Sequence, residues 1–285
     1  MTSAWPFDHC DIVEELSGGS NRRFFRVRCA KGVFVVMQAQ VKEIERYIKV
    51  RDKLSISGIG VPSIVDVKDK FVLLEDLGDL SLYKYIKTYG PSVDIYKKVM
   101  SELIKLQKSN IDGLPVFGRE KLFGEFLHFK RFYVPYAGID TASWDEKVYF
   151  LVEKCHNAAY VPMHRDLQST NIFIKNGKIY FVDFQDMHMG PLYFDIASLL
   201  FDPYIMLKTD LIWQLVEYYK GIVKIEFERE GLLSCGVLRL MQALGAFVKL
   251  SMEGKVFFER FIKAGRLRLM ELLRDMELSD MADLL

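Results

Sequence analysis

The chain has 285 residues, of which half are hydrophobic and 27% are charged, as is usual for a globular protein with a sizeable core. Its formal net charge of +1 argues against binding to nucleic acid or to an acidic membrane through bulk charge. No run of about 18 uninterrupted apolar residues predicts a membrane span, and the acidic N-terminal stretch does not fit a signal peptide. We expect a monomer in the cytoplasm that contacts neither nucleic acid nor membrane.

The cysteines are few and lie far apart in the sequence. Cys10, Cys29, Cys155 and Cys235 include no Cys-x-x-Cys pair, so the spacing predicts neither a zinc site nor a disulfide framework. Unpaired thiols would fit a reducing cytoplasm.

The first part of the chain predicts a small sheet with one crossing helix. Two strands, Phe24–Arg28 and Val33–Gln38, precede a helical pattern over Val41–Ser55. A second pair of strands, Val61–Val67 and Phe71–Leu74, follows the helix.

The rest of the chain is mainly helical and predicts a second, larger lobe. Helical patterns cover about 92–109, 119–132, 145–157, 209–224, 230–251 and 254–276. The predicted fold is α+β, with a β-rich lobe at residues 1–78, a helical lobe at 79–285 and a cleft between them that the chain crosses near Leu74–Leu80.

One β segment interrupts the helices and carries the chemistry. Asn176–Gly177 is a strong two-residue hairpin signal. A turn at those residues places Asn171 opposite Val182, next to Asp183, with Asp166 in the loop before the first strand. Oxygen ligands of this kind suit magnesium, and a carboxylate outside the metal site can accept a proton from an attacking hydroxyl.

The segment HRDLQSTN, followed by a hairpin and DFQD, resembles the catalytic loop and metal motif of protein kinases. It is more similar to the aminoglycoside phosphotransferase and choline kinase group, which shares the protein-kinase-like fold. The extension DFQDMHMGPLYFDIASLL is similar to bacterial kinases that phosphorylate the anomeric hydroxyl of N-acetylmuramate or N-acetylglucosamine. The resemblance implies a kinase that uses ATP and Mg²⁺ and phosphorylates a sugar or amino sugar.

The same resemblance implies roles for individual residues. Asp166 would be the catalytic base, and Asn171 and Asp183 would be the magnesium ligands. His164 would support the loop, and Asp195 would tie the following helix back to it. The alternative is that these residues merely cap turns and strands.

The small lobe is expected to bind the nucleotide. Gly18, Gly19 and Ser20 lie in a turn whose backbone N–H groups can cradle phosphates, although a plain hairpin turn has the same composition. The segment that contains Glu75 and Leu77 resembles the segment of kinases whose backbone binds adenine. The resemblance implies that main-chain groups of these two residues contact the base.

The lysine that protein kinases place on the third strand is missing. Its position falls on Gln38, which is neutral. Among Arg22, Arg23 and Arg26 we favour Arg23 as the substitute phosphate contact, although a solvated arginine on a strand edge has the same pattern.

The acceptor site is less clearly marked. Glu125 is either a ligand of a sugar hydroxyl or a solvated acid beside a core stripe that includes Phe126 and Leu127. Asp186 and Gln168 flank the catalytic residues and either touch the acceptor or serve the metal site and the loop.

A neutral or anionic sugar fits best, because residues 190–285 show no acidic surplus for a polycationic aminoglycoside. A choline-type acceptor stays open. The alternative from another class is a nucleotide-binding scaffold without transfer activity, which the missing lysine supports.

Overall fold

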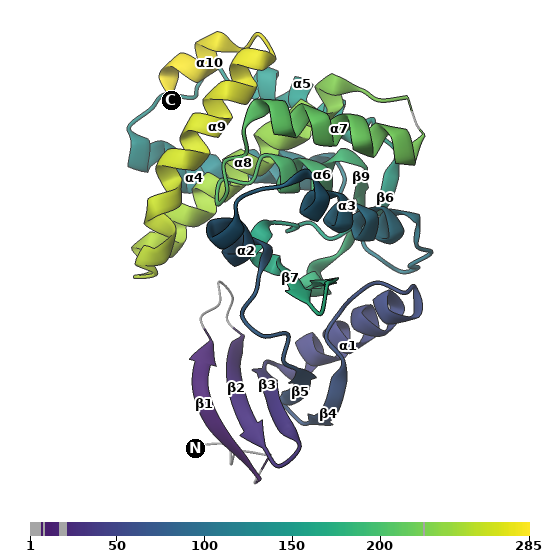
Figure 1. The fold of residues 1–285 in the computed structure, drawn as a ribbon. Coiled ribbons are helices and arrows are strands. Elements are labelled where there is room, and N and C mark those ends of the chain that lie inside the picture. The colour runs from purple at the N-terminus through teal and green to yellow at the C-terminus, as the bar shows by residue number, and fades with distance from the viewer. Residues whose placement is uncertain (1–6, 8, 17–21, 225) are drawn as a thin grey trace.

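The computed structural model describes residue 7 and residues 9–16, 22–224 and 226–285. The described residues form a sheet-bearing N-terminal part and a helical C-terminal part, and the two termini lie at opposite ends of the molecule (Figure 1). The chain passes from one part to the other through the short segment 76–81.

The N-terminal part is an antiparallel sheet with strand order β1-β2-β3-β5-β4. Its strands are β1 (Cys10–Leu16), β2 (Arg23–Cys29), β3 (Gly32–Gln38), β4 (Ile64–Lys68) and β5 (Phe71–Glu75), with helix α1 (Val41–Ile56) between β3 and β4. The predicted strands and helix are confirmed. Strand β1 was not predicted, because it is an exposed, acidic edge strand without a buried apolar face.

Alternation along the strands gives this sheet two apolar faces. Val36 and Leu73 belong to a small cluster on one face, whereas their neighbours Met37 and Leu74 join the main core on the face that α1 covers. Leu54 of α1 is buried in that main core. The sheet is therefore buried on both faces, and its central strands are continuously hydrophobic.

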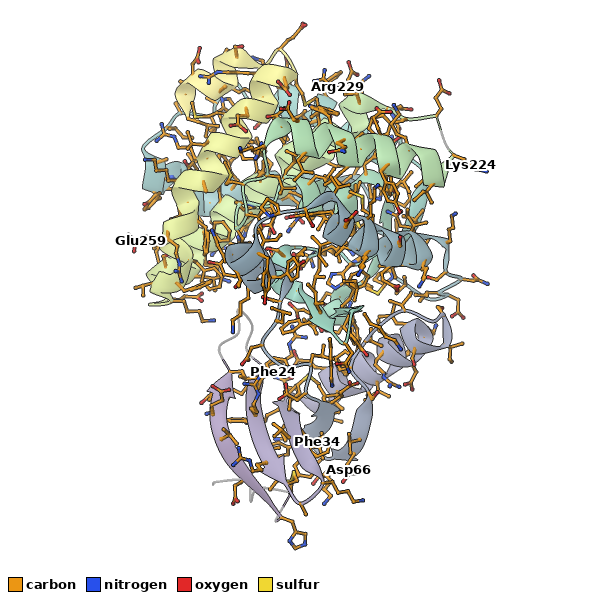
Figure 2. All side chains as sticks on the ribbon, in the orientation of Figure 1. Phe24, Phe34, Asp66, Lys224, Arg229 and Glu259 are labelled. Carbon is orange, nitrogen blue, oxygen red and sulfur yellow. A yellow bond between two sulfur atoms is a disulfide. The ribbon has the colours of Figure 1, made fainter. Side chains whose placement is uncertain are left out.

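The C-terminal part is a set of helices around one long central helix. The helices are α2 (Leu82–Tyr89), α3 (Val93–Lys108), α4 (Arg119–Ala137), α5 (Asp145–His156), α6 (Tyr193–Leu200), α7 (Thr209–Val223), α8 (Arg229–Met252), α9 (Ile262–Asp275) and α10 (Ser279–Leu284). Helix α8 packs against α4, α5, α6 and α9. Figure 2 shows side chains packed densely among these helices. The helix expected at 254–276 instead begins with a 3₁₀ turn at Val256–Phe261, which redirects the chain before α9.

Among the described residues, α8 is the one helix whose length and composition would allow it to cross a membrane. Within the fold, 89% of its most apolar stretch is buried by the surrounding protein. A helix that is apolar all round is typical of a protein core as well as of a membrane, and here the surrounding helices supply the apolar contacts.

The cysteines correct the expectation of unpaired thiols. Cys10 of β1 forms a disulfide with Cys29 of β2, and Cys155 of α5 forms one with Cys235 of α8. Their Cα atoms lie 4.2 and 5.3 Å apart, although 19 and 80 positions separate the pairs in sequence. Strand pairing and helix packing bring the pairs together. The cysteine spacing therefore carries no argument for a reducing compartment.

The predicted hairpin is confirmed in its turn and its register. Strands β7 (Ile172–Lys175) and β8 (Lys178–Phe181) pair with Ile172 opposite Phe181 and Lys175 opposite Lys178. Asn176 and Gly177 both adopt positive φ, at 52° and 74°, as a two-residue turn of this kind requires. A second short pair, β6 (Tyr160–Met163) and β9 (His188–Pro191), flanks the hairpin in sequence.

The hairpin touches both parts of the molecule (Figure 1). The Phe181 amide donates to the carbonyl of Gly60 at 2.8 Å, and the Ile174 amide donates to the carbonyl of Leu80 at 2.9 Å. A Cβ atom on Gly60 would meet the carbonyl oxygen of Ile179 at 2.0 Å. Glycine at position 60 therefore allows the sheet part to approach the hairpin backbone closely.

We predict that Gly60→Ala lowers the free energy of unfolding by about 1–3 kcal/mol, because the backbone of β8 must shift to accept the added methyl group. Urea denaturation measures the change. Gly221→Ala is the matched control, since its added Cβ meets nothing within 4 Å on the exposed face of α7. That control should be neutral or slightly stabilising, and equal effects in both variants would contradict the close approach at Gly60.

Candidate active site

The open end of the hairpin brings three sequence-predicted residues together. The Val182 amide donates to the carbonyl of Asn171 at 3.0 Å, which sets Asn171 beside Asp183. The side-chain amide of Asn171 donates to the carbonyl of Asp166 at 3.0 Å. Asp183 adopts a left-handed conformation with φ 64°, which is uncommon for a residue other than glycine and is often found at functional sites.

A buried carboxylate holds the start of the catalytic loop. Asp195 of α6 accepts the backbone amides of His164 at 2.6 Å and Arg165 at 2.9 Å. Its burial raises the pKa of the carboxyl, and the electrostatic interaction with His164 and the hydrogen bonds from these two amides act against that rise. His164 is 1% exposed, and its Nε2 lies 2.9 Å from the carbonyl of Val182. This contact connects the loop to the residue before Asp183.

A second buried carboxylate holds the end of the same loop and was missed by sequence reasoning. Asp202 accepts the amide of Ser169 at 2.7 Å and that of Tyr204 at 2.8 Å. The available signal was an acid directly after the apolar run of α6, because a lone acid in such a setting needs hydrogen-bond donors when it is buried.

A buried arginine contacts the predicted base and was also missed. Arg239 of α8 has an Nη2 atom 3.3 Å from Asp166 Oδ1, and it donates to Ser198 Oγ at 2.9 Å and to Gln242 Oε1 at 2.7 Å. Its side chain is 7% exposed, against 33% for Asp166. A single arginine inside the apolar α8 was the signal, since a buried charge requires a partner.

The arginine that lies beside the metal motif is Arg22, whereas the sequence favoured Arg23 as the phosphate contact. Arg22 Nη2 donates to Asp183 Oδ1 at 3.0 Å, and its side chain is 9% exposed. Arg23 lies opposite Gln38 in the sheet, and its guanidinium binds the carboxylate of Glu15 at 2.8 and 2.9 Å and is 58% exposed. Glu15 belongs to the edge strand β1, so the guanidinium of Arg23 is directed to that strand.

Arg26 is committed elsewhere as well. It binds Asp76 at 2.9 Å and Asp79 at 2.8 Å, in the segment that connects the two parts. In Figure 2, the labelled Phe24 lies at the end of the sheet that faces the helices, and Phe34 lies further away. Arg22 therefore extends from the end of the sheet nearest the hairpin.

The other predicted nucleotide contacts are only partly described. Gly18, Gly19 and Ser20 lie outside the described residues. The amide of Glu75 is used inside the sheet, where it donates to the carbonyl of Ser63 at 2.9 Å. The backbone of Leu77 makes no hydrogen bond to a described residue, so its amide and carbonyl can serve a bound base.

Glu125 is buried, which corrects the interpretation of α4 as a helix with Leu127 on its core stripe. Leu127 is 51% exposed, whereas Glu125 is 4% exposed and belongs to the buried face with Phe126. Burial raises the pKa of the Glu125 carboxyl to about 7, with the nearby Arg239 and Arg165 acting against the rise and Asp166 adding to it. Glu125 thus lies within the electrostatic reach of the predicted base, as an acceptor ligand would.

Asp186 and Gln168 also lie at the site. Asp186 Oδ1 forms an ion pair with Arg46 of α1 at 3.0 Å, and the carbonyl of Asp186 accepts from His188 Nδ1 at 2.8 Å. The Gln168 amide donates to the carbonyl of Asp166 at 2.9 Å, and its side chain shares with Arg239 the lining of a cavity of about 10 Å³. A larger cavity of about 410 Å³, between Leu207 and Arg268, is lined by none of the predicted site residues.

The donor set fits magnesium held jointly by protein and phosphate. Asn171 uses its amide nitrogen on Asp166, so its oxygen remains for a cation. Asp183 offers a carboxylate beside it. The described residues contain no group of three or more His, Cys, Asp or Glu that would hold a metal alone. Magnesium usually takes one or two protein carboxylates and completes its shell with water and phosphate oxygens, which fits this sparse set.

Comparison with known sequences decides the family. A sequence profile of the phosphotransferase enzyme family matches residues 12–219. The chain belongs to this family. It is 28% identical to the N-acetylmuramate/N-acetylglucosamine kinase of Pseudomonas aeruginosa over 206 residues, which are 68% of this chain and 61% of that protein. It is 26% identical to the protein of that name from Neisseria meningitidis over 234 residues, 77% of this chain and 70% of that protein.

Solved structures confirm the fold of this phosphotransferase. The Plasmodium vivax ethanolamine kinase superposes with a TM-score of 0.67 at 16% identity, covering 93% of this chain and 82% of that one. Aminoglycoside phosphotransferase APH(4)-Ia superposes with a TM-score of 0.66 at 14% identity, covering 94% and 95%. At these identities the likeness establishes the protein-kinase-like fold, as predicted from the sequence, and leaves the acceptor open.

The pKa of Glu125 predicts a specific pH dependence of stability. A carboxyl whose pKa is raised in the folded state binds its proton more tightly there, so stability is greatest at low pH and falls as the pH rises toward about 7. Glu125→Gln cannot ionise. The free energy of unfolding of the variant minus that of wild type should therefore be about 2–3 kcal/mol larger at about pH 8.5 than at about pH 5. Urea denaturation at both pH values tests this, and a difference that does not change with pH would contradict the buried, ionising carboxyl.

Proposed function

We propose that this phosphotransferase transfers the γ-phosphoryl group of ATP to a hydroxyl of a sugar or amino sugar, with the anomeric hydroxyl of N-acetylmuramate or N-acetylglucosamine as the acceptor. The observation that carries the proposal is the convergence of Asp166, Asn171 and Asp183 at the open end of the β7–β8 hairpin. A scaffold without transfer activity would not need all three groups in this arrangement.

In the proposed reaction Asp166 acts on the acceptor. Its carboxylate is one-third exposed, and one of its oxygens is held by the buried Arg239. The acceptor hydroxyl gives its proton to Asp166 while its oxygen bonds to the γ-phosphorus, and the bond from that phosphorus to the bridging oxygen of ADP breaks. A magnesium ion held by Asn171 and Asp183 would neutralise charge on the phosphate oxygens. Arg22 would supply the cation that the lysine-free β3 lacks.

Two features favour a neutral or anionic sugar over a polycationic aminoglycoside or choline. The curated relatives are named for N-acetylmuramate and N-acetylglucosamine. The residue before the base is Arg165, and Lys121 lies within the electrostatic reach of both Arg165 and Arg46. Cations at the acceptor side repel a cationic substrate, which is an effective means of excluding it.

We predict that ADP release from Mg-ATP is stimulated by N-acetylmuramate or N-acetylglucosamine, and that Asp166→Asn lowers kcat by about 10²–10⁴-fold with little change in ATP binding. A coupled ADP assay over a panel of amino sugars, kanamycin-type aminoglycosides and choline identifies the acceptor. Stimulation by choline or an aminoglycoside alone would reject the sugar assignment. A variant that keeps more than about a tenth of wild-type kcat would reject Asp166 as the base.

The arginines of the sheet give a second prediction. Arg22→Ala should lower kcat/KM for ATP by about one to three orders of magnitude, the range for losing one charge-stabilising donor. Arg23→Ala is the matched control, because Arg23 is exposed and its guanidinium forms an ion pair with Glu15. Steady-state kinetics with a working acceptor distinguish the two. A defect in Arg23→Ala together with normal kinetics in Arg22→Ala would restore the interpretation made from the sequence.

A further inference from the structure

Three cations from separate elements form a group around one lysine, and one of the three directly precedes the predicted base in the chain. They are Arg46 of α1, Lys121 of α4 and Arg165 of the catalytic loop. Arg46 is paired with Asp186 at 3.0 Å. Burial lowers the pKa of the Lys121 amine, and the charges of Arg165 and Arg46 lower it further, so each arginine lies close enough to Lys121 to repel its charge.

A continuous set of contacts connects this group. Lys121 Nζ lies 2.7 Å from His188 Nε2, and His188 Nδ1 lies 2.8 Å from the carbonyl of Asp186. A carbonyl oxygen only accepts, so Nδ1 carries the proton and Nε2 accepts from Lys121. The ring of Phe117 meets His188 edge-on at 5.4 Å, and the guanidinium of Arg165 lies 5.5 Å from the centre of the same ring.

Two of these cations lack a full anionic partner among the described residues. The hydrogen-bond partner of Lys121 is a neutral imidazole. The nearest carboxylate to Arg165 is that of Glu125, at 3.9 Å, which is too long for a hydrogen bond and belongs to a group with a pKa of about 7. Arg165 Nε is buried and makes no hydrogen bond to a described residue. The other carboxylates here are already engaged, Asp166 by Arg239 and Asp183 by Arg22.

We propose that Lys121 and Arg165 form an anion subsite that binds a carboxylate carried by the acceptor. Lys121 is exposed and therefore open to a ligand, and it lies one helical turn before Glu125 on the same face of α4. Arg165 immediately precedes Asp166, so the subsite adjoins the group that receives the acceptor's proton. A carboxylate provides the charge that this pair lacks, and Arg165 can bind it with two parallel hydrogen bonds.

This inference rests on the proposed sugar kinase function and makes it more specific. N-acetylmuramate and N-acetylglucosamine differ by one lactyl ether, which carries the carboxylate. If the subsite binds that carboxylate, the wild type has different kcat/KM values for the two sugars, and this difference disappears when the charge of Lys121 is removed.

The test is steady-state kinetics of wild type, Lys121→Gln and Lys121→Arg with both sugars. Lys121→Gln should lower kcat/KM for N-acetylmuramate by about 10- to 100-fold, the effect of losing a hydrogen bond to a charged group. Its kcat/KM for N-acetylglucosamine and its KM for ATP should change little, and Lys121→Arg should restore most of the loss. Lys130→Gln is the matched control on the same helix, since Lys130 already has a carboxylate partner in Asp145, at 3.0 Å.

Each other outcome has a definite meaning. An equal loss of kcat/KM for both sugars would mean that Lys121 has a structural role and would overturn the subsite. A raised KM for ATP alone would mean that Lys121 binds the nucleotide, which would also overturn it. If the wild type phosphorylates neither sugar, the proposed function fails, and calorimetric titration with N-acetylmuramate in the presence of a non-hydrolysable Mg-ATP analogue still tests the subsite. Binding to wild type but not to Lys121→Gln would support it, and absence of binding to wild type would overturn it.

Discussion

The structure of the site depends on buried carboxylates that hold the backbone of the catalytic loop. Asp195 binds the two amides at its start and Asp202 the amide of Ser169 at its end. Removing a carboxylate from water costs several kcal/mol unless hydrogen bonds and opposite charge replace the lost solvent. Here backbone amides and the charge of Arg239 do so. Because the loop amides are needed to satisfy these buried charges, the loop cannot change conformation without destabilising the helical core. Asp166 lies in this loop and is therefore held in a fixed position.

The two parts of the molecule meet through the hairpin, which explains how a sheet and a helical core can share one site. Gly60 and Leu80 accept hydrogen bonds from β8 and β7, and Tyr47 of α1 stacks on Phe184 with ring centres 4.9 Å apart. Phe184 directly follows Asp183. A movement of α1 would therefore reach the metal motif through a stacked aromatic pair, and Arg22 adds an ionic contact to the same aspartate.

Charge is distributed unevenly around Asp166, Asn171 and Asp183. On the hairpin side, Asp183 and Asn171 present oxygen atoms for a cation, with Arg22 beside them. On the side of α4, Lys121 lies within the electrostatic reach of Arg165, and Arg165 lies 3.9 Å from Glu125, whose carboxyl ionises only near neutrality. Under the proposed function, this arrangement favours an acceptor that carries hydroxyl groups and a negative charge over a substrate with several ammonium groups.

Sequence by itself determined the features that depend on local chemistry. The turn at Asn176–Gly177 needs two residues that tolerate positive φ, and this requirement alone set the hairpin register and the proximity of Asn171 to Asp183. The helix and strand patterns were readable for the same reason, because amphipathic periodicity is a property of neighbouring residues. Only the tertiary structure decided the pairing of the cysteines, the burial of Glu125, the contact of Arg239 with Asp166 and the contact of Arg22 with Asp183. Each of these depends on which distant elements pack together, and sequence separation carries no measure of that distance.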